Sequence, residues 1–92
     1  MEIEYDAKKN EKNIRERGLS FDLVSKFDFE TALYIVDHRR NYSETRYRAL
    51  GKLNNRVHAL VFTETETGIR VISFRKANSR EVKLYEKETD KN

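Results

Sequence analysis

The chain contains no cysteine and no proline, and only three glycines, at positions 18, 51 and 68. Without cysteine there can be no disulfide, thiolate metal site or thiol nucleophile, which agrees with a reducing compartment. The scarcity of proline and glycine argues against flexible linkers and low-complexity segments. At 92 residues the chain suits one small core. We therefore expect residues 1–92 to form a single compact domain.

Long apolar runs are also missing. No stretch approaches the roughly 20 apolar residues that span a bilayer, and MEIEYDAKKNEK at the N-terminus lacks the apolar centre of a secretion signal. These features predict a cytoplasmic protein with no membrane-embedded part.

Charge is abundant but nearly balanced. Nineteen Lys and Arg residues oppose sixteen Asp and Glu residues, a formal net charge of +3. Salt screens exposed charges beyond roughly 8 Å at physiological ionic strength, so this excess does not by itself indicate a polyanionic partner. The placement of the cations is more informative than their number.

Two N-terminal helices are predicted from their end signals. Asp6 has the position of an N-cap for a helix over residues 7–17, which Gly18 ends. Ser20 is placed to cap a second helix over residues 21–27, whose apolar side chains recur every three residues.

A capping box predicts a third helix near the C-terminus. Asn78 is followed at the required spacing by Glu81, and Val82 and Tyr85 would then face inward. The tail KETDKN, residues 87–92, is expected to fray.

Between these helices the sequence has the pattern of a sheet. A strand begins at EIEY, and four strand-like segments with short connections follow, which favours antiparallel pairing. The predicted fold class is α+β: a sheet of about four antiparallel strands, two N-terminal helices and a C-terminal helix, with the helices on one side. The four segments are residues 31–37, 45–53, 56–64 and 69–76.

The strand patterns also predict faces. Residues 31–37 are apolar on both sides, as in a strand covered on both faces. In residues 45–53 the alternation places Arg46 and Arg48 on a face that is either wet or directed at a ligand. Strict alternation over residues 69–76 would put Arg75 opposite Arg70 and Lys76.

Cations accumulate where the last strand ends. Arg75 and Lys76 lie just before a helix N-terminus, whose free N–H groups attract anions, so a phosphate would fit there. The alternative is that they are solubilising charges.

A second basic segment lies between the first two long strands. DHRRNY, residues 37–42, supplies His38, Arg39, Arg40 and Tyr42. Basic groups interleaved with tyrosine are typical of single-stranded RNA surfaces, although charged loops are often only solvated connections.

Common catalytic motifs are missing. There is no glycine-rich phosphate loop and no zinc-type cluster, and His58, within an apolar strand, is predicted to be a core histidine. Glu64 is expected near Arg70, as a cross-strand ion pair. RNA cleavage by its own 2′-hydroxyl nevertheless requires only a group that orients or deprotonates that hydroxyl, cations for the phosphorane and an acid for the leaving oxygen.

The sequence resembles the BrnT ribonuclease toxins of type II toxin–antitoxin systems. The similarity runs from YDAKKNEKNIRERG through SFDLVSKFD, ETRYRALG and ALVFTE to IRVISFRKANSREVKLYE, the most specific segment. It implies a RelE-like fold, an endoribonuclease activity without metal or cofactor that arrests growth, and neutralisation by a BrnA-like ribbon-helix-helix antitoxin. Operator DNA would be bound through that antitoxin.

Three positions depart from the family pattern. Glu16 and Arg17 stand before Gly18 where relatives usually have Lys-His, Thr65 stands in place of an arginine, and Phe74 replaces an alanine. A role of the missing histidine is therefore lost or transferred to Arg17.

These observations give one site hypothesis and one rival. In the site hypothesis, Arg70, Arg75 and Lys76 hold the scissile phosphate, and Glu64 and His38 are candidates for proton transfer. The neighbouring RNA would be bound by Arg39, Arg40, Arg46 and Arg48. The rival is a non-catalytic RNA-binding module, or a degenerate toxin that acts only as a corepressor with its antitoxin.

Overall fold

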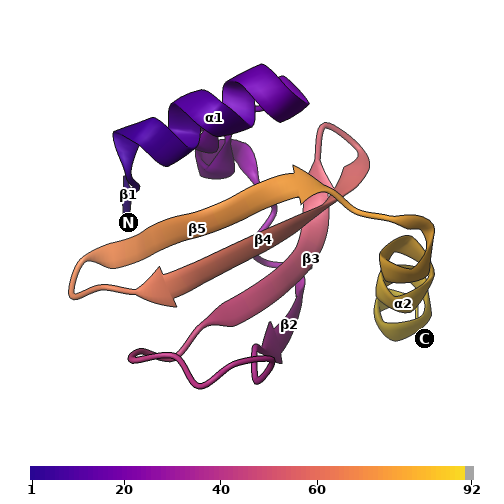
Figure 1. Cartoon of the computed structure of the whole chain (residues 1–92). Helices are drawn as coiled ribbons and strands as arrows, with labels where there is room; N and C mark the ends of the chain where they lie inside the picture. The colour runs from indigo at the N-terminus through magenta and orange to yellow at the C-terminus, as the bar shows by residue number, and fades with distance from the viewer. Residues whose placement is uncertain (91–92) are drawn as a thin grey trace.

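The computed structural model describes residues 1–90 and contains one five-stranded sheet with helices on both of its faces (Figure 1). The strand order across the sheet is β1-β5-β4-β3-β2. In chain order the elements are β1 (Glu2–Glu4), α1 (Ala7–Arg17), the 3-10 helix η1 (Phe21–Lys26), β2 (Leu33–Val36), β3 (Tyr47–Leu53), β4 (Arg56–Glu64), β5 (Gly68–Lys76) and α2 (Ser79–Thr89).

The sheet is mixed rather than wholly antiparallel. The four predicted strands pair antiparallel as β2 to β5. The short strand β1 adds a fifth, parallel to β5, with Glu2 opposite Gly68 and Glu4 opposite Arg70. Because β1 covers only the first third of β5, the second half of β5 forms an open edge.

The predicted helix ends are confirmed. The Asp6 side chain accepts from the backbone of Lys8 and Lys9, and Gly18 ends α1 with a φ of 65°, a left-handed conformation that favours glycine. Ser20 caps the second segment, which is a single 3-10 helix instead of an α-helix.

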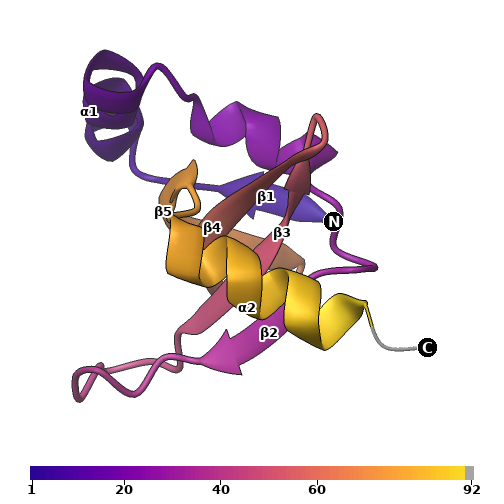
Figure 2. The ribbon, with the colours of Figure 1, turned by 90° about the vertical axis from the view of Figure 1, so that its right-hand side faces the viewer.

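The prediction that all helices lie on one side of the sheet is wrong. Helix η1 packs a buried cluster, including Phe21, Val24 and Phe27, against one face. On the other face a second cluster joins Leu50 to Tyr85 of α2. Figure 2 shows α1 on the far side of the strands from α2. The sequence pattern of β3 and β4, apolar on both faces, is what permits two cores.

The prediction that β2 is covered on both faces is also wrong. This strand forms the sheet edge opposite β1, and Tyr34 and Val36 are 47 % and 40 % exposed. Only one side of β2 is partly buried, where Leu33 packs against the second cluster.

A β-bulge changes the predicted faces of β5. Phe62 pairs with Val71 but Val61 pairs with Ser73, so Ile72 is an extra residue on β5. The alternation resets at this point. Arg70 and Arg75 consequently share one face, whereas Lys76 lies on the other.

The C-terminal segment is more ordered than predicted. Residues 87–89 continue α2, and Thr89 donates from its hydroxyl to the Tyr85 carbonyl. The expectation of fraying for residues 91–92 lies outside the described residues.

Candidate functional site

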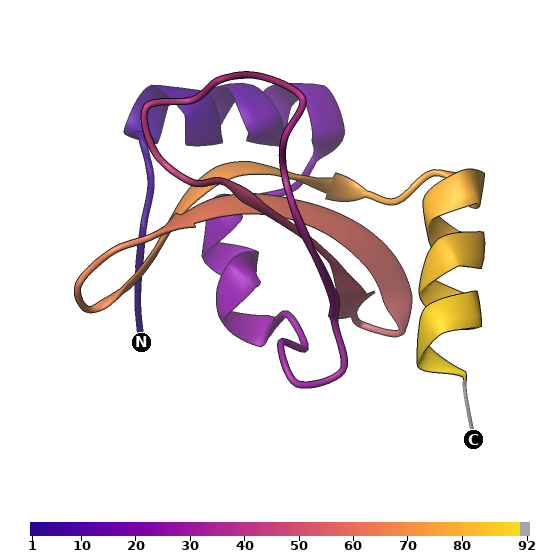
Figure 3. The same ribbon diagram turned by 90° about the horizontal axis from the view of Figure 1, so that it is seen from below.

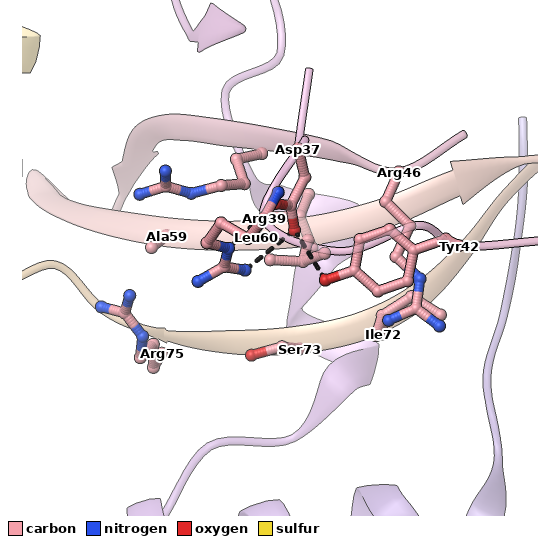
Figure 4. A pocket seen from close by; sticks show the side chains of 11 residues that line it. Asp37, Arg39, Tyr42, Arg46, Ala59, Leu60, Ile72, Ser73 and Arg75 are labelled. Atoms are coloured by element: carbon pink, nitrogen blue, oxygen red, sulfur yellow. Dashed lines mark hydrogen bonds and ion pairs between the residues drawn. The ribbon is translucent and has the colours of Figure 1, made fainter. Parts of the chain in front are cut away.

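Four arginines line one hollow on the face of the sheet that α2 partly covers. Arg48 comes from β3, Arg75 from β5, and Arg39 and Arg46 from the loop between β2 and β3 (Figure 4). The floor is formed by Ala59, Leu60 and Val61 of β4 together with Ile72 and Ser73. We call this the arginine hollow. Its volume is about 130 Å³, well below the roughly 300 Å³ at which small-molecule pockets begin, so it suits a single charged group better than a cofactor.

The loop part of the hollow is built on Asp37. This residue is only 4 % exposed, and its carboxylate receives two hydrogen bonds from the Arg39 guanidinium, at 2.9 and 2.8 Å. It also accepts from the Tyr42 hydroxyl at 3.3 Å. The Arg39 hydrogen bonds hold the pKa of Asp37 far below its usual range, so this carboxylate is an anchor and a poor proton acceptor.

Arg46 stacks on the ring of Tyr42, with the guanidinium carbon 4.0 Å from the ring centroid. Its Nε donates to Glu44 at 3.1 Å, and its backbone carbonyl accepts from the Asp37 N–H, which closes the loop at its base. The stack and the closed loop together fix where this cation lies.

The strand part of the hollow is built on Glu81 at the start of α2. Its carboxylate accepts from Arg75 at 2.8 and 3.0 Å and from Arg48 at 3.2 Å. Burial by itself would raise the pKa of Glu81. The hydrogen bonds from Arg75 have the largest effect and lower this pKa to about 2. The same carboxylate completes the predicted capping box with Asn78. One residue therefore fixes both a helix end and two arginines.

The resulting electrostatics favour an anion. Four guanidinium groups are paired with three carboxylates, of which Asp37 and Glu81 are buried and Glu44 is exposed. Because the arginines are held in place before any ligand arrives, an incoming phosphate would not have to order them. Bidentate guanidinium geometry matches phosphate oxygens.

Not all the predicted catalytic cations meet in this hollow. Arg75 lines it, but Arg70 lies at the other end of β5, where its guanidinium is 3.4 Å from the Glu4 carboxylate. Lys76 points to the opposite face with His58, its strand neighbour. The expected pairing of Glu64 with Arg70 is absent among residues 1–90 because Glu64 faces Ile69 in the register. Glu64 instead lies by Tyr47, whose pKa it raises.

The two remaining loop candidates, His38 and Arg40, do not line the arginine hollow itself. His38 and Arg40 line an adjoining hollow that shares Asp37, Tyr42 and Arg46 with the arginine hollow. His38 is thus near the cations but not among them.

His58 is a core residue, as predicted. It is 3 % exposed, its ring lies against Phe74, and Nδ1 is 2.7 Å from the Arg56 carbonyl. Burial lowers its pKa.

Two negative observations concern residues 1–90. They contain no cluster of three or more His, Asp or Glu side chains placed to hold a metal ion. None of their helices has the length and apolar character needed to cross a membrane.

Sequence reasoning missed both organising carboxylates. Asp37 and Glu81 each lie within two residues of an arginine in the sequence. Only the tertiary structure shows that both carboxylates are buried. Glu81 was assigned to helix capping alone. The signal for Asp37 was an acid at the end of an apolar strand, immediately before three basic residues.

A hollow lined by four arginines and a tyrosine has the chemical groups that bind a phosphate backbone. Residues 5–81 match the family of the ribonuclease toxin BrnT of type II toxin–antitoxin systems. The chain belongs to this family, and every residue of the arginine hollow falls within the match. Membership implies a ribonuclease activity, an RNA substrate and a cognate antitoxin. Comparison with curated proteins found no match.

Proposed function

We propose that the arginine hollow is the catalytic site of a metal-independent endoribonuclease that cleaves RNA within single strands. The single observation that carries this proposal is the convergence of Arg39, Arg46, Arg48 and Arg75 on one small hollow. Buried carboxylates hold three of them, so the positive charge is fixed in space.

The reaction uses the substrate's own nucleophile. The 2′-oxygen bonds to the adjacent phosphorus while the bond from phosphorus to the 5′-oxygen breaks, which leaves a 2′,3′-cyclic phosphate and a 5′-hydroxyl. One proton leaves the 2′-hydroxyl and one is delivered to the 5′-oxygen. Arginines around the phosphorane stabilise the charge that develops on its oxygens.

His38 is the proposed proton-transfer group. It lines the hollow that adjoins the arginine hollow, and imidazole can both accept and donate a proton. Arg40 lines the same adjoining hollow as His38, and Lys76 lines a further hollow together with Arg75. Both cations are placed to contact the phosphates on either side of the scissile phosphate. Glu64 and Arg70 do not line the arginine hollow, so the proposal gives them no direct part in RNA cleavage.

In the cell the activity would arrest growth until a cognate antitoxin, of the ribbon-helix-helix kind by family resemblance, binds the toxin. The complex would then bind operator DNA through the antitoxin.

The test is cleavage of single-stranded RNA by purified protein in excess chelator. We expect cleavage to persist without metal, to yield 2′,3′-cyclic phosphate ends, and to stop when the RNA is replaced by its 2′-deoxy form. Arg75→Gln, purified in parallel, controls for contaminating ribonuclease. Cleavage that requires added metal, or that leaves 5′-phosphates, would overturn the mechanism.

The rival function is a non-catalytic RNA-binding module or a corepressor. Arg17 and Thr65, which replace a usual histidine and arginine of the family, favour it. It predicts RNA binding without cleavage in the same assay.

A further inference from the structure

The arginine hollow does not end at β5. Ile72 and Ser73 line both this hollow and a second one beside α1, which contains Lys9, Lys12 and Arg17. Arg75 likewise lines both the arginine hollow and a third one with Arg17 and Lys76. Three concave surfaces therefore share walls around the end of β5.

The backbone explains how this continuity arises. Strand β1 stops at Glu4, so beyond Arg70 β5 has no strand neighbour on this edge and pairs only with β4 on the other. Helix α1 lies along this open edge instead (Figure 3), and the Asn13 side chain donates to the Phe74 carbonyl at 2.9 Å. The bulge at Ile72 lies at the crossing point between the sheet face and the helix.

The cations on α1 and the nearby Lys76 of β5 are engaged by carboxylates weakly or not at all. Among residues 1–90, Lys9, Arg17 and Lys76 form no ion pair. Lys12 pairs only loosely with Glu16, at 4.0 Å between two exposed side chains. They are available to a polyanion, and they lie on the far side of β5 from the loop arginines.

We infer that the RNA strand leaves the arginine hollow over the open edge of β5 and continues along α1, with Arg17 and Lys9 contacting its phosphates. This inference rests on the proposed function and extends it from a single scissile phosphate to a substrate of several nucleotides. It assigns the α1 surface to RNA rather than to an acidic segment of a protein partner.

The experiment measures binding without cleavage. The ligands are 2′-O-methyl RNA strands of about three and about ten nucleotides. They cannot be cleaved, because the 2′-oxygen is methylated, but each phosphate carries the same charge as in unmodified RNA. The variants are the double change Arg17→Gln with Lys9→Gln, and the double change Lys83→Gln with Lys87→Gln, two exposed residues of α2, as a matched loss of two charges.

We expect the double variant to bind the long strand several-fold more weakly and the short strand as tightly as the parent. The dependence of log Kd on log salt for the long strand should become shallower by about 0.7 per lost phosphate contact. Lys83→Gln with Lys87→Gln should change neither quantity.

An unchanged Kd and salt slope for the long strand would overturn the inference, as would loss of affinity only for the antitoxin. Equal weakening for short and long strands would also overturn it. These outcomes are separable from failure of the proposed function, because absence of cleavage by the parent protein leaves the binding comparison intact.

Discussion

The guanidinium of Arg75 and the carboxylate of Glu81 are joined by two hydrogen bonds, of 2.8 and 3.0 Å. The oxygen that accepts the shorter one also accepts the backbone N–H of Asn78 at 2.9 Å. The start of α2 and a wall of the arginine hollow therefore share one carboxylate, which makes Glu81 a positioning residue rather than a catalytic one.

Glu81→Gln should slow RNA cleavage more than it weakens RNA binding. Glutamine can retain the capping box but cannot hold two arginines through charge. We expect kcat to fall by at least about tenfold while KM changes little, since a small misplacement of a stabilising cation acts mainly on the transition state. Glu81→Asp, which keeps the charge on a shorter side chain, should recover part of the rate. Equal rates for Glu81→Gln and the parent would contradict this role.

Stability should decline below about pH 4.5 because of the same residue. The folded state lowers the pKa of Glu81 from its ordinary value of 4.5 to about 2, so its contribution is present above pH 4.5 and is lost as the pH falls towards 2. The full contribution is on the order of 3 kcal/mol. Urea unfolding between pH 7 and pH 3 should show a smaller loss of free energy in Glu81→Gln than in the parent. An equal loss of unfolding free energy in the two proteins would show that ionisation of Glu81 does not stabilise the fold.

Arg39→Gln should destabilise the protein more than Asp37→Asn does. The Asp37 side chain is fully buried, whereas that of Arg39 is 61 % exposed. Removing the arginine leaves a buried charge without its cation, but removing the carboxylate leaves a cation that water can solvate. We expect about 2 kcal/mol for the first change and about 1 kcal/mol for the second, measured by chemical denaturation. The reverse order would contradict the view that Asp37 is buried as a charged anchor.

His38→Gln should lower the cleavage rate by about a hundredfold without changing the melting temperature. His38 is an exposed loop residue, so its replacement should not affect packing, and general acid–base catalysis typically contributes factors of this size. Single-turnover cleavage assays check the rate, and a parent-like rate in His38→Gln would contradict its role in proton transfer. His58→Gln is the comparison that should damage folding instead, since His58 is in the core.

Local signals predicted the helix ends and most strand boundaries correctly. Asp6, Ser20 and Asn78 each satisfy backbone N–H groups within a few residues of themselves, so their roles can be inferred from spacing alone. The turn at Asn54 and Asn55, both with positive φ, is another local feature that residue type indicates.

The faces of β5 were beyond such reasoning. An alternating pattern assumes one residue per pleat, and the extra residue at Ile72 is determined by pairing with β4, not by the sequence of β5. Without the bulge Arg70 would share a face with Lys76, but with it Arg70 shares the face of Arg75. The catalytic roles stay a prediction: the structure brings Arg75 together with Arg39, Arg46 and Arg48, and it does not place Arg70 or Lys76 in the same hollow.

The most direct measurement is the single-turnover rate of RNA cleavage by Arg75→Gln in excess chelator, compared with the parent and with Lys83→Gln. Arg48 still pairs with Glu81 at 3.2 Å after this change, so the melting temperature should fall by only a few degrees. We predict a rate at least about a hundredfold below that of the parent, with Lys83→Gln unaffected. Cleavage by Arg75→Gln at the parent rate would contradict catalysis in the arginine hollow.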